Sequence, residues 1–228
     1  MSITCHVCGG REFRFEPVLW DELVEAWGLS EDERAYVDRQ QGECCQACGA
    51  NLRSIALAGA IRSALGMEQW LNDGLGRRRW RKLRVLELNE AGTLSPLLQQ
   101  MDGHVLGVYP EVDMQAMPYP DGTFDLVVHS DTLEHVPDPV QALRECRRVL
   151  GPAGVLCYTV PIIVGRMSRR RDGLPPSWHG QSGTVDEDWK VQTEYGADAW
   201  CQVMEAGFSS AGLSAVAWPA AVAITARP

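Results

Sequence analysis

The sequence contains no run of eighteen apolar residues, so nothing in it predicts a helix that spans a membrane. Its first ten residues also lack a basic stretch followed by an apolar one, which favours a cytoplasmic protein over an exported one. Basic residues are in deficit, because 21 Lys and Arg oppose 30 Asp and Glu for a formal net charge of −9. Since non-specific affinity for nucleic acids comes mainly from neutralised phosphates, long nucleic acids are disfavoured as partners.

The 228 residues, 45% of them hydrophobic, suffice for one α/β domain of ordinary size and a small appendage. We divide the chain into a segment 1–75 and a domain 76–228. Basic residues gather in two short runs, within 77–84 and within 166–171. The first run is predicted to be a solvated linker, with phosphate binding as the alternative.

Cysteine spacing is the clearest local signal. The sequence has two CxxCG motifs, CHVCG and CQACG, and the 36 residues 9–44 separate the last cysteine of the first motif from the first cysteine of the second. Each two-residue gap lets both sulfurs reach one ion, so the motifs predict a four-thiolate structural Zn²⁺ site. The predicted ligands are Cys5, Cys8, Cys45 and Cys48.

Details of the two motifs refine this prediction. The glycine after each motif can adopt the positive φ that turns the chain under a metal. Cys44 could replace Cys45 in another register, but only Cys45 keeps the two-residue gap to Cys48. Unligated thiols are the alternative. Four cysteine ligands leave no open position on the ion, so its expected role is structural.

Helical patterns fill the rest of the amino-terminal segment. Between the motifs, residues 21–41 predict two short helices, the second opened by a capping box of Ser30 and Glu33. After the second motif, 51–75 predicts an amphipathic helix that packs on the next domain. Leu52 and Ile55 fall off its apolar stripe. These patterns predict a small helical subdomain that is closed by zinc.

Residues 83–228 alternate strand and helix patterns, which favours a doubly wound parallel sheet. A strand within 83–92 ends in a small-residue turn, and 103–111 predicts a second strand. A third strand, 124–129, leads through LEH to an amphipathic helix, a GPAG turn and a further strand. A late helix and two closing strands complete the pattern.

Three short motifs follow one another in this sequence: MPYPDGTFDLVV, TLEHV and RRVLGPAG. In this order they resemble the core motifs of the class I S-adenosylmethionine-dependent methyltransferase superfamily. The resemblance implies a Rossmann-like fold and S-adenosylmethionine as cofactor. Nicotinamide-binding and purely scaffolding doubly wound domains are the alternatives. In the family, the first strand ends in an acid and a glycine-rich loop that hold the cofactor, and the resemblance implies that the residues at these positions bind it here. Glu87 matches the acid, whereas Asn89 and Ala91 stand where glycines are usual, beside Gly92.

The chain is shorter than the family's pattern, because only the 20 residues 93–112 separate Gly92 from Asp113. That length does not fit the usual two helices and two strands, so part of the pattern must be missing. Tyr109 or Glu111 is predicted to replace the acid that holds the ribose hydroxyls. Asp113 resembles the acceptor for the adenine amino group, with Met114 against the ring; a solvated turn is the alternative for Asp113.

The remaining site residues follow from position in the resembling pattern. His129 and Ser130 are predicted beside the cofactor, at the end of their strand, while Asp125 at its start is expected to be structural. His135 is either an active-site residue or a cap or core residue. Segment 162–195 is long enough to be a substrate loop or simply a solvated one. Its arginines, Trp178, His179 and Tyr195 are candidates, with His179 and Tyr195 as bases.

Together these features predict methyl transfer to oxygen or nitrogen of a small-molecule or carrier-bound acceptor, such as a sugar, a lipid precursor or a secondary metabolite. Two other functions stay open. One is RNA modification, because some ribosomal RNA guanine methyltransferases also carry an amino-terminal zinc ribbon. The other is a binding module without catalysis, since the glycine loop is degraded.

Overall fold

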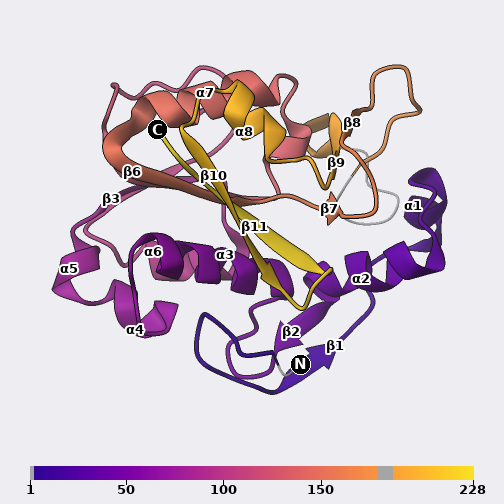
Figure 1. The fold of residues 1–228 in the computed structure, drawn as a ribbon, viewed down its shortest axis with the longest axis horizontal. Helices are drawn as coiled ribbons and strands as arrows, with labels where there is room; N and C mark the ends of the chain where they lie inside the picture. The colour runs from indigo at the N-terminus through magenta and orange to yellow at the C-terminus, as the bar shows by residue number, and fades with distance from the viewer. Residues whose placement is uncertain (1–2, 179–186) are drawn as a thin grey trace.

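A six-stranded sheet forms the centre of the computed structural model, which describes residues 3–178 and 187–228 (Figure 1). The strand order is β10-β11-β6-β5-β3-β4. β4, β3, β5 and β6 run parallel, β11 is antiparallel to β6, and β10 is antiparallel to β11. The strands are β3 (Arg84–Leu88), β4 (Gly103–Gly107), β5 (Phe124–Ser130), β6 (Leu150–Thr159), β10 (Ser210–Val216) and β11 (Ala221–Arg227).

Helices cover both faces of this sheet, which confirms the doubly wound α/β prediction (Figure 1). The apolar runs of β3 and β5 are buried nearly throughout, as expected for strands with both faces covered. Within the described residues, no helix is long and apolar enough to cross a membrane. The covering helices are α3 (Leu52–Ala64) and α6 (Ser95–Leu98) on one face, and α7 (Pro139–Val149) and α8 (Cys201–Glu205) on the other.

The expected shortening of the fold lies between β3 and β5. After β3 come the 3-10 turn η1 (Gly92–Leu94), α6 and β4, and residues 108–123 then return to β5 without a helix or strand. β4 is therefore an edge strand, hydrogen-bonded on one side to β3. The third parallel strand of the usual pattern is missing, as the short segment between Gly92 and Asp113 predicted.

The amino-terminal segment contains the two predicted short helices. The capping box of Ser30 and Glu33 is present at the start of the second helix, where the two residues exchange side-chain and backbone hydrogen bonds. Two short strands pair antiparallel beside the helices. The elements are β1 (Phe13–Phe15), α1 (Asp21–Ala26), α2 (Glu31–Gly42) and β2 (Glu43–Cys45).

α3 is buried on nearly every side, and the prediction of an amphipathic helix over 51–75 was wrong in this respect. Leu52 and Ile55, expected off the apolar stripe, are both fully buried. One face of α3 packs on β10, β11 and β6, and one hydrophobic cluster runs from Cys5 through α3 into β3 and β5. The apolar periodicity of α3 did not predict this burial, because the faces outside the apolar stripe carry small residues and polar residues that are also buried.

The predicted linker over 77–84 is also more structured than expected. Residues 71–81 form two short helices, α4 (Leu71–Leu75) and α5 (Arg78–Arg81). Trp80 is buried, and its indole Nε1 donates to the carbonyl of Leu65 at 3.3 Å. The charges of the run still face solvent, while its tryptophan anchors it to the core.

Segment 162–195 contains a small sheet of order β7-β9-β8, built from β7 (Ile162–Ile163), β8 (Arg169–Arg170) and β9 (Thr193–Gly196), with a 3-10 turn η3 (Glu187–Trp189). Arg166 Nε donates to Glu33 Oε1 at 2.7 Å, which ties this segment to α2. The hydrogen bond from Arg166 holds the pKa of Glu33 at about 2, and burial opposes this only partly.

We expect Glu33→Gln to lower the free energy of unfolding by about 1 kcal/mol at neutral pH, because Gln keeps the cap but loses the charge. The folded pKa of about 2 lies below the unfolded value of 4.5. The stabilisation is therefore present above pH 4.5 and is lost as the pH falls towards 2. Denaturant unfolding at several pH values, with Glu31→Gln as control, should show the difference from the native protein narrowing below pH 4.5. A constant difference would contradict it.

Candidate functional site

A cavity of about 760 Å³ lies at the carboxyl ends of β3, β4 and β5. Loops after these strands form one wall, and η3 with the 3-10 turn η2 (Leu133–His135) forms another. Gln41 of α2 and the first turn of α3 complete it. Crevices at the carboxyl ends of parallel strands are where doubly wound folds bind ligands.

The cavity brings together part of the predicted set. Residues of that set on its wall are Asn89, Gly92, Tyr109, Asp113, Met114, Ser130 and His135. Glu87, Ala91, His129 and Tyr195 are buried and do not line it. His179 lies outside the described residues. Gln41, Asn51 and Ser54 line the cavity without having been predicted, since they belong to the amino-terminal segment.

Asn89 and Gly92 shape the loop after β3. Their φ angles are 53° and 55°, so asparagine does adopt the left-handed conformation that a glycine usually supplies. The Asn89 amide donates to Gly107 O at 2.8 Å, and its Oδ1 accepts from the Tyr109 amide at 3.1 Å. Asn89 thus joins the loops after β3 and β4, and both Asn89 and Gly92 line the cavity.

Glu87 lies beneath this loop instead of in the cavity. The residue is completely buried. Its Oε1 accepts from the Ala91 amide at 2.8 Å, and its Oε2 is 2.7 Å from His104 Nε2. Direct cofactor contact by Glu87 and Ala91 was predicted; the structure instead uses this carboxylate to brace the loop from inside.

Asp113 and Met114 lie on the same wall, in the loop after β4. Asp113 Oδ1 accepts from the Gln115 amide at 2.8 Å, which fixes the carboxylate, and Oδ2 accepts from the Gln115 side chain at 3.4 Å. Met114 is almost fully buried beside Leu88 and Val112 of the same wall. The arrangement offers apolar surface and a carboxylate together, as a purine with an amino group requires. Glu111 is exposed and does not line the cavity.

The end of β5 forms the floor. Ser130 Oγ is 2.8 Å from Thr159 Oγ1, and Asp131 has a φ of 51°. Arg53 of α3 forms an ion pair with Asp131 Oδ1, and Gln41 Nε2 donates to Oδ2 at 3.0 Å. Two helices of the amino-terminal segment therefore hold the residue that follows β5.

His135 borders the cavity next to Trp189. The two rings meet edge to face with centroids 6.4 Å apart, and His135 Nδ1 is 3.1 Å from Lys190 O. Its Nε2 is 3.8 Å from Glu134 Oε1. Tyr195, predicted as a base, is buried, and its hydroxyl donates to Gln202 at 3.0 Å. Burial raises the pKa of Tyr195 well above its usual value, which opposes that role.

His129 is a core residue behind the cavity, contrary to the prediction of a cofactor contact. Its ring stacks on Tyr158 with centroids 4.7 Å apart, and the residue is fully buried. Burial lowers the pKa of His129 to about 4, and the charge of Glu134 opposes this only weakly. The ring is therefore neutral at physiological pH.

Because the unfolded pKa of His129 is near 6.5 and the folded one about 4, the unfolded chain gains a proton first as the pH falls. Stability associated with His129 is present above pH 6.5 and declines towards pH 4. We expect the free energy of unfolding of His129→Phe to fall less between pH 7 and 4.5 than that of the native protein, by about 3 kcal/mol at most. Denaturant unfolding at pH 7 and 4.5 measures it. An unchanged slope would contradict the burial of a neutral ring.

The four predicted cysteines form a cluster in which all sulfurs lie within 4.8 Å of one another. The Sγ–Sγ distances are 3.6 Å for Cys5 and Cys48 and 3.7 Å for Cys8 and Cys45. A tetrahedral Zn²⁺ with Zn–S bonds of about 2.3 Å needs sulfurs roughly 3.8 Å apart. The cluster therefore fits this ion.

Both motifs turn as predicted. Gly9 and Gly49 have φ angles of 80° and 77°, and their amides donate to the carbonyls of Cys5 and Cys45 at 2.8 Å. Cys44 lies outside the cluster, with its thiol directed to the Gln41 carbonyl at 3.5 Å.

Backbone amides also act on the sulfurs. Burial alone would raise the pKa of Cys45, but the N–H groups of Cys48 and Ala47 lower it overall. Burial raises the pKa of Cys48 to about 11. Because a metal ligand must be a thiolate, an ion at this cluster would have to offset the cost of burying negative sulfur.

The arginines predicted to bind substrate anions are used within the protein. Arg169 and Arg171 both pair with Glu194, and Arg170 Nη1 donates to the Pro137 carbonyl at 2.5 Å. No Lys or Arg lines the described cavity, whereas Glu90, Asp113, Asp131, Glu187 and Asp188 do.

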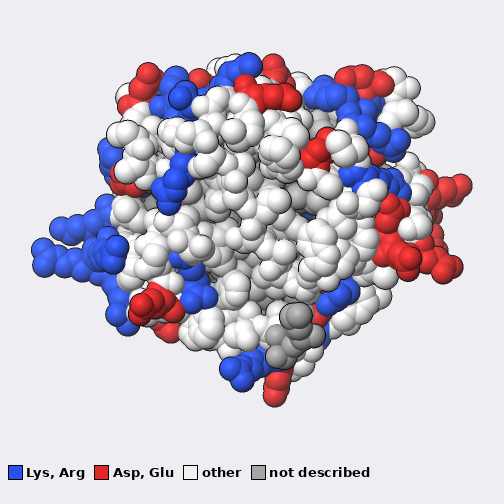
Figure 2. All heavy atoms as spheres, viewed as in Figure 1, with Lys and Arg blue, Asp and Glu red and all other residues white. Residues whose placement is uncertain are grey.

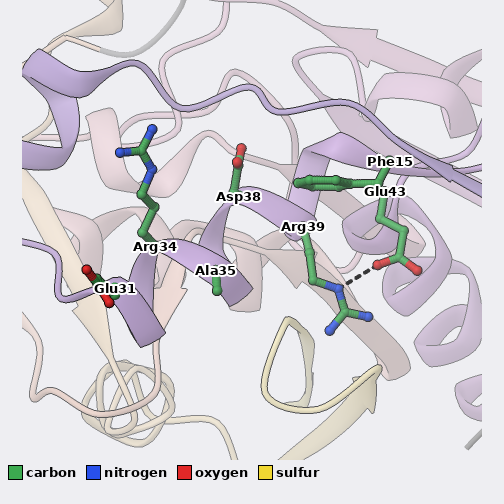
Figure 3. A pocket seen from close by; sticks show the side chains of 7 residues that line it. All are labelled: Phe15, Glu31, Arg34, Ala35, Asp38, Arg39 and Glu43. Atoms are coloured by element: carbon green, nitrogen blue, oxygen red, sulfur yellow. Dashed lines mark hydrogen bonds and ion pairs between the residues drawn. The ribbon is translucent and has the colours of Figure 1, made fainter.

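A second hollow, about 490 Å³, lies over α2 (Figure 3). None of its lining residues belongs to the central sheet. Its charged groups are largely paired, as Figure 3 shows for Arg39 Nε and Glu43 Oε2 at 2.6 Å. Asp38 Oδ1 accepts from the amides of Val18 and Leu19. The hydrogen bonds of Asp38 therefore join α2 to the chain that precedes it.

The two ends of the molecule differ in charge (Figure 2). Lys and Arg project at the end where α5 lies, and Asp and Glu project at the opposite end near α1. Only Lys82 and Leu83 separate α5 from the first residue of β3, so the basic end lies at the amino ends of the strands. The cavity is at the other edge of the sheet.

Comparison with known proteins identifies this arrangement. Residues 92–158 match the family model described as a methyltransferase domain. Within residues 92–158 the chain therefore carries a methyltransferase domain, and it is similar to S-adenosylmethionine-dependent methyltransferases. The matched region runs from the loop after β3 to the end of β6, and it contains most of the cavity wall.

Curated relatives point to the same kind of domain. A probable S-adenosylmethionine-dependent methyltransferase of Mycobacterium tuberculosis is 41% identical over 89 residues, 37% of this chain and 32% of the relative. The 2-methyl-6-phytyl-1,4-hydroquinone methyltransferase 1 of Oryza sativa is 42% identical over 52 residues, 23% of this chain and 16% of the relative. The alignments thus cover a third or less of these relatives.

Solved structures are similar at low identity. A possible histamine N-methyltransferase from Thermotoga maritima has 14% identity and a TM-score of 0.46, over 77% of this chain and 89% of that one. The trans-methyltransferase CalH, in complex with S-adenosylhomocysteine, has 16% identity and a TM-score of 0.45, over 86% and 58%.

Proposed function

We propose that the protein transfers a methyl group from S-adenosylmethionine to a small acceptor bound in the cavity at the carboxyl ends of β3, β4 and β5. The observation that carries this proposal is the pair of left-handed residues Asn89 and Gly92, which shape the loop after β3 and line the cavity. The family assignment supplies the cofactor.

The cofactor, when bound, offers a methyl group on a sulfonium that needs no further activation. In this proposal, the backbone around Gly92 accommodates its amino-acid part, Asp113 accepts from its adenine amino group, and Met114 contacts the ring. His135 stands at the other wall, where it would accept a proton from an acceptor that is not already nucleophilic. Alignment of acceptor and methyl group then provides most of the rate enhancement.

Charge favours an acceptor that is neutral or positive. A phosphate or carboxylate would enter a cavity with five carboxylates on its wall and, among the described residues, no cationic side chain to pair with it. The half-exposed Trp189 provides a flat apolar surface next to His135. We therefore favour a small uncharged acceptor over one carried on a phosphate. Oxygen and nitrogen remain the proposed acceptor atoms; the rice relative is named for an aromatic hydroquinone.

RNA modification receives less support. The basic end of the molecule lies at the sheet edge opposite the cavity, so nucleic acid bound there would not reach the proposed methyl group. Catalysis is favoured over a mere binding role because the loop after β3 retains its left-handed backbone despite its missing glycines.

We expect isothermal titration calorimetry to detect S-adenosylhomocysteine binding to the native protein. Asp113→Ala should weaken that binding by about 1–3 kcal/mol, because it removes a partner for a buried amino group. Glu111→Gln, two residues away and outside the cavity, is the matched control and should bind like the native protein. No binding by the native protein would refute the proposed function, and full affinity of Asp113→Ala would refute the adenine assignment.

The four-cysteine cluster is proposed to hold one structural Zn²⁺. Metal analysis of the purified protein should therefore find about one zinc per chain. Cys48→Ser should release the metal and lower solubility, because apolar residues of the segment depend on the closed cluster. Cys44→Ser changes the residue next to Cys45 that is not part of the cluster, so this variant should keep both the metal and the native solubility. A folded, zinc-free native protein would exclude the site.

A further inference from the structure

The second cysteine motif leads into the cavity within a few residues. Asn51 and Ser54, which line the cavity, follow Cys48 by three and six positions. Asn51 is the N-cap of α3, where its side chain accepts from the Ser54 amide at 2.9 Å, and it bridges back to Cys44. The geometry of the motif therefore sets where this helix begins.

The first cysteine motif holds the same helix from the side. A Cβ on Gly59 of α3 would lie 2.1 Å from His6 Nδ1, so the ring of His6 sits directly on the helix backbone. His6 belongs to the CHVC motif. Closing the cluster thus fixes α3 at its start and at its middle, and any rotation of the helix would displace both contacts.

The position of α3 is transmitted to the cavity floor by Arg53. Arg53 is buried and forms its ion pair with Asp131, whose φ of 51° places it in a conformation unfavourable for most residues. Gln41 of α2 donates to the other carboxylate oxygen. Asp131 lies between Ser130 and Thr132, and all three line the cavity.

We infer that the four-cysteine cluster controls cofactor affinity, with Arg53, Gln41 and Asp131 as positioning residues that carry its effect to the cavity floor. The inference rests on the proposed function, since it concerns the same cavity. It goes beyond a structural metal, because it makes the cluster a determinant of binding in a protein that is already folded.

The test is calorimetry of the full chain with S-adenosylhomocysteine, accompanied by circular dichroism and zinc analysis of each sample. We expect Arg53→Met and Asp131→Asn each to weaken binding about fivefold to tenfold, and the double variant to lose less than the product of the two, as coupled residues do. Arg53→Lys should recover part of the affinity. Zinc content should stay at the native value.

Arg62→Met is the matched control, because Arg62 lies on the same helix but donates to the carbonyls of Gln69 and Glu68, away from the cavity. It should bind like the native protein. Gln41→Ala removes one exposed hydrogen bond to Asp131 and leaves the buried ion pair intact, so it tests the inference even if Arg53→Met fails to fold.

Metal removal by a chelator provides the second arm. The chelated chain should lose affinity for S-adenosylhomocysteine while its far-ultraviolet spectrum is retained, and added Zn²⁺ should restore the affinity. Unchanged affinity in folded Gln41→Ala and Asp131→Asn would overturn the inference while leaving the proposed function intact. No binding by the native, zinc-loaded protein would refute both.

Discussion

The burial of α3 on nearly every side is the constraint on which the rest of the molecule depends. The helix separates the cysteine cluster from the central sheet and contacts both, so the amino-terminal segment cannot form its core without the sheet. Apolar burial contributes about 25 cal/mol per Å², and a helix with this many fully buried side chains is the largest single source of that energy in the segment. The amino-terminal segment, with its four-cysteine cluster, is consequently part of one core with the sheet.

Local patterns predicted much of this fold. The alternation of strands and helices identified the doubly wound sheet, the motif spacing identified the four cysteines, and Ser30 with Glu33 identified a helix start. These features depend on neighbours a few residues apart. The missing strand was also predictable, because the length between Gly92 and Asp113 sets an upper limit on what can fit.

Other features depend on contacts between distant parts of the chain and were not predictable. Glu87 and His129 lie on strands that end at the cavity, yet the side chains face the interior, and a single sequence does not show which face of a fully buried strand meets the ligand. The arginines of 166–171 looked available for anions until their carboxylate partners, Glu33 and Glu194, were placed beside them. Gln41 and Ser54 reach the cavity from a segment that carried only a metal signature.

The loss of the third parallel strand also affects how the molecule meets its neighbours. β4 is left with one row of backbone N–H and C=O groups directed outwards, and such a row can template pairing with another chain. Its five residues begin and end with glycine, although Val105 at its centre is exposed. Short edges of this kind offer few registers to an incoming strand. The shortened domain thus limits the risk of aggregation that its own truncation creates.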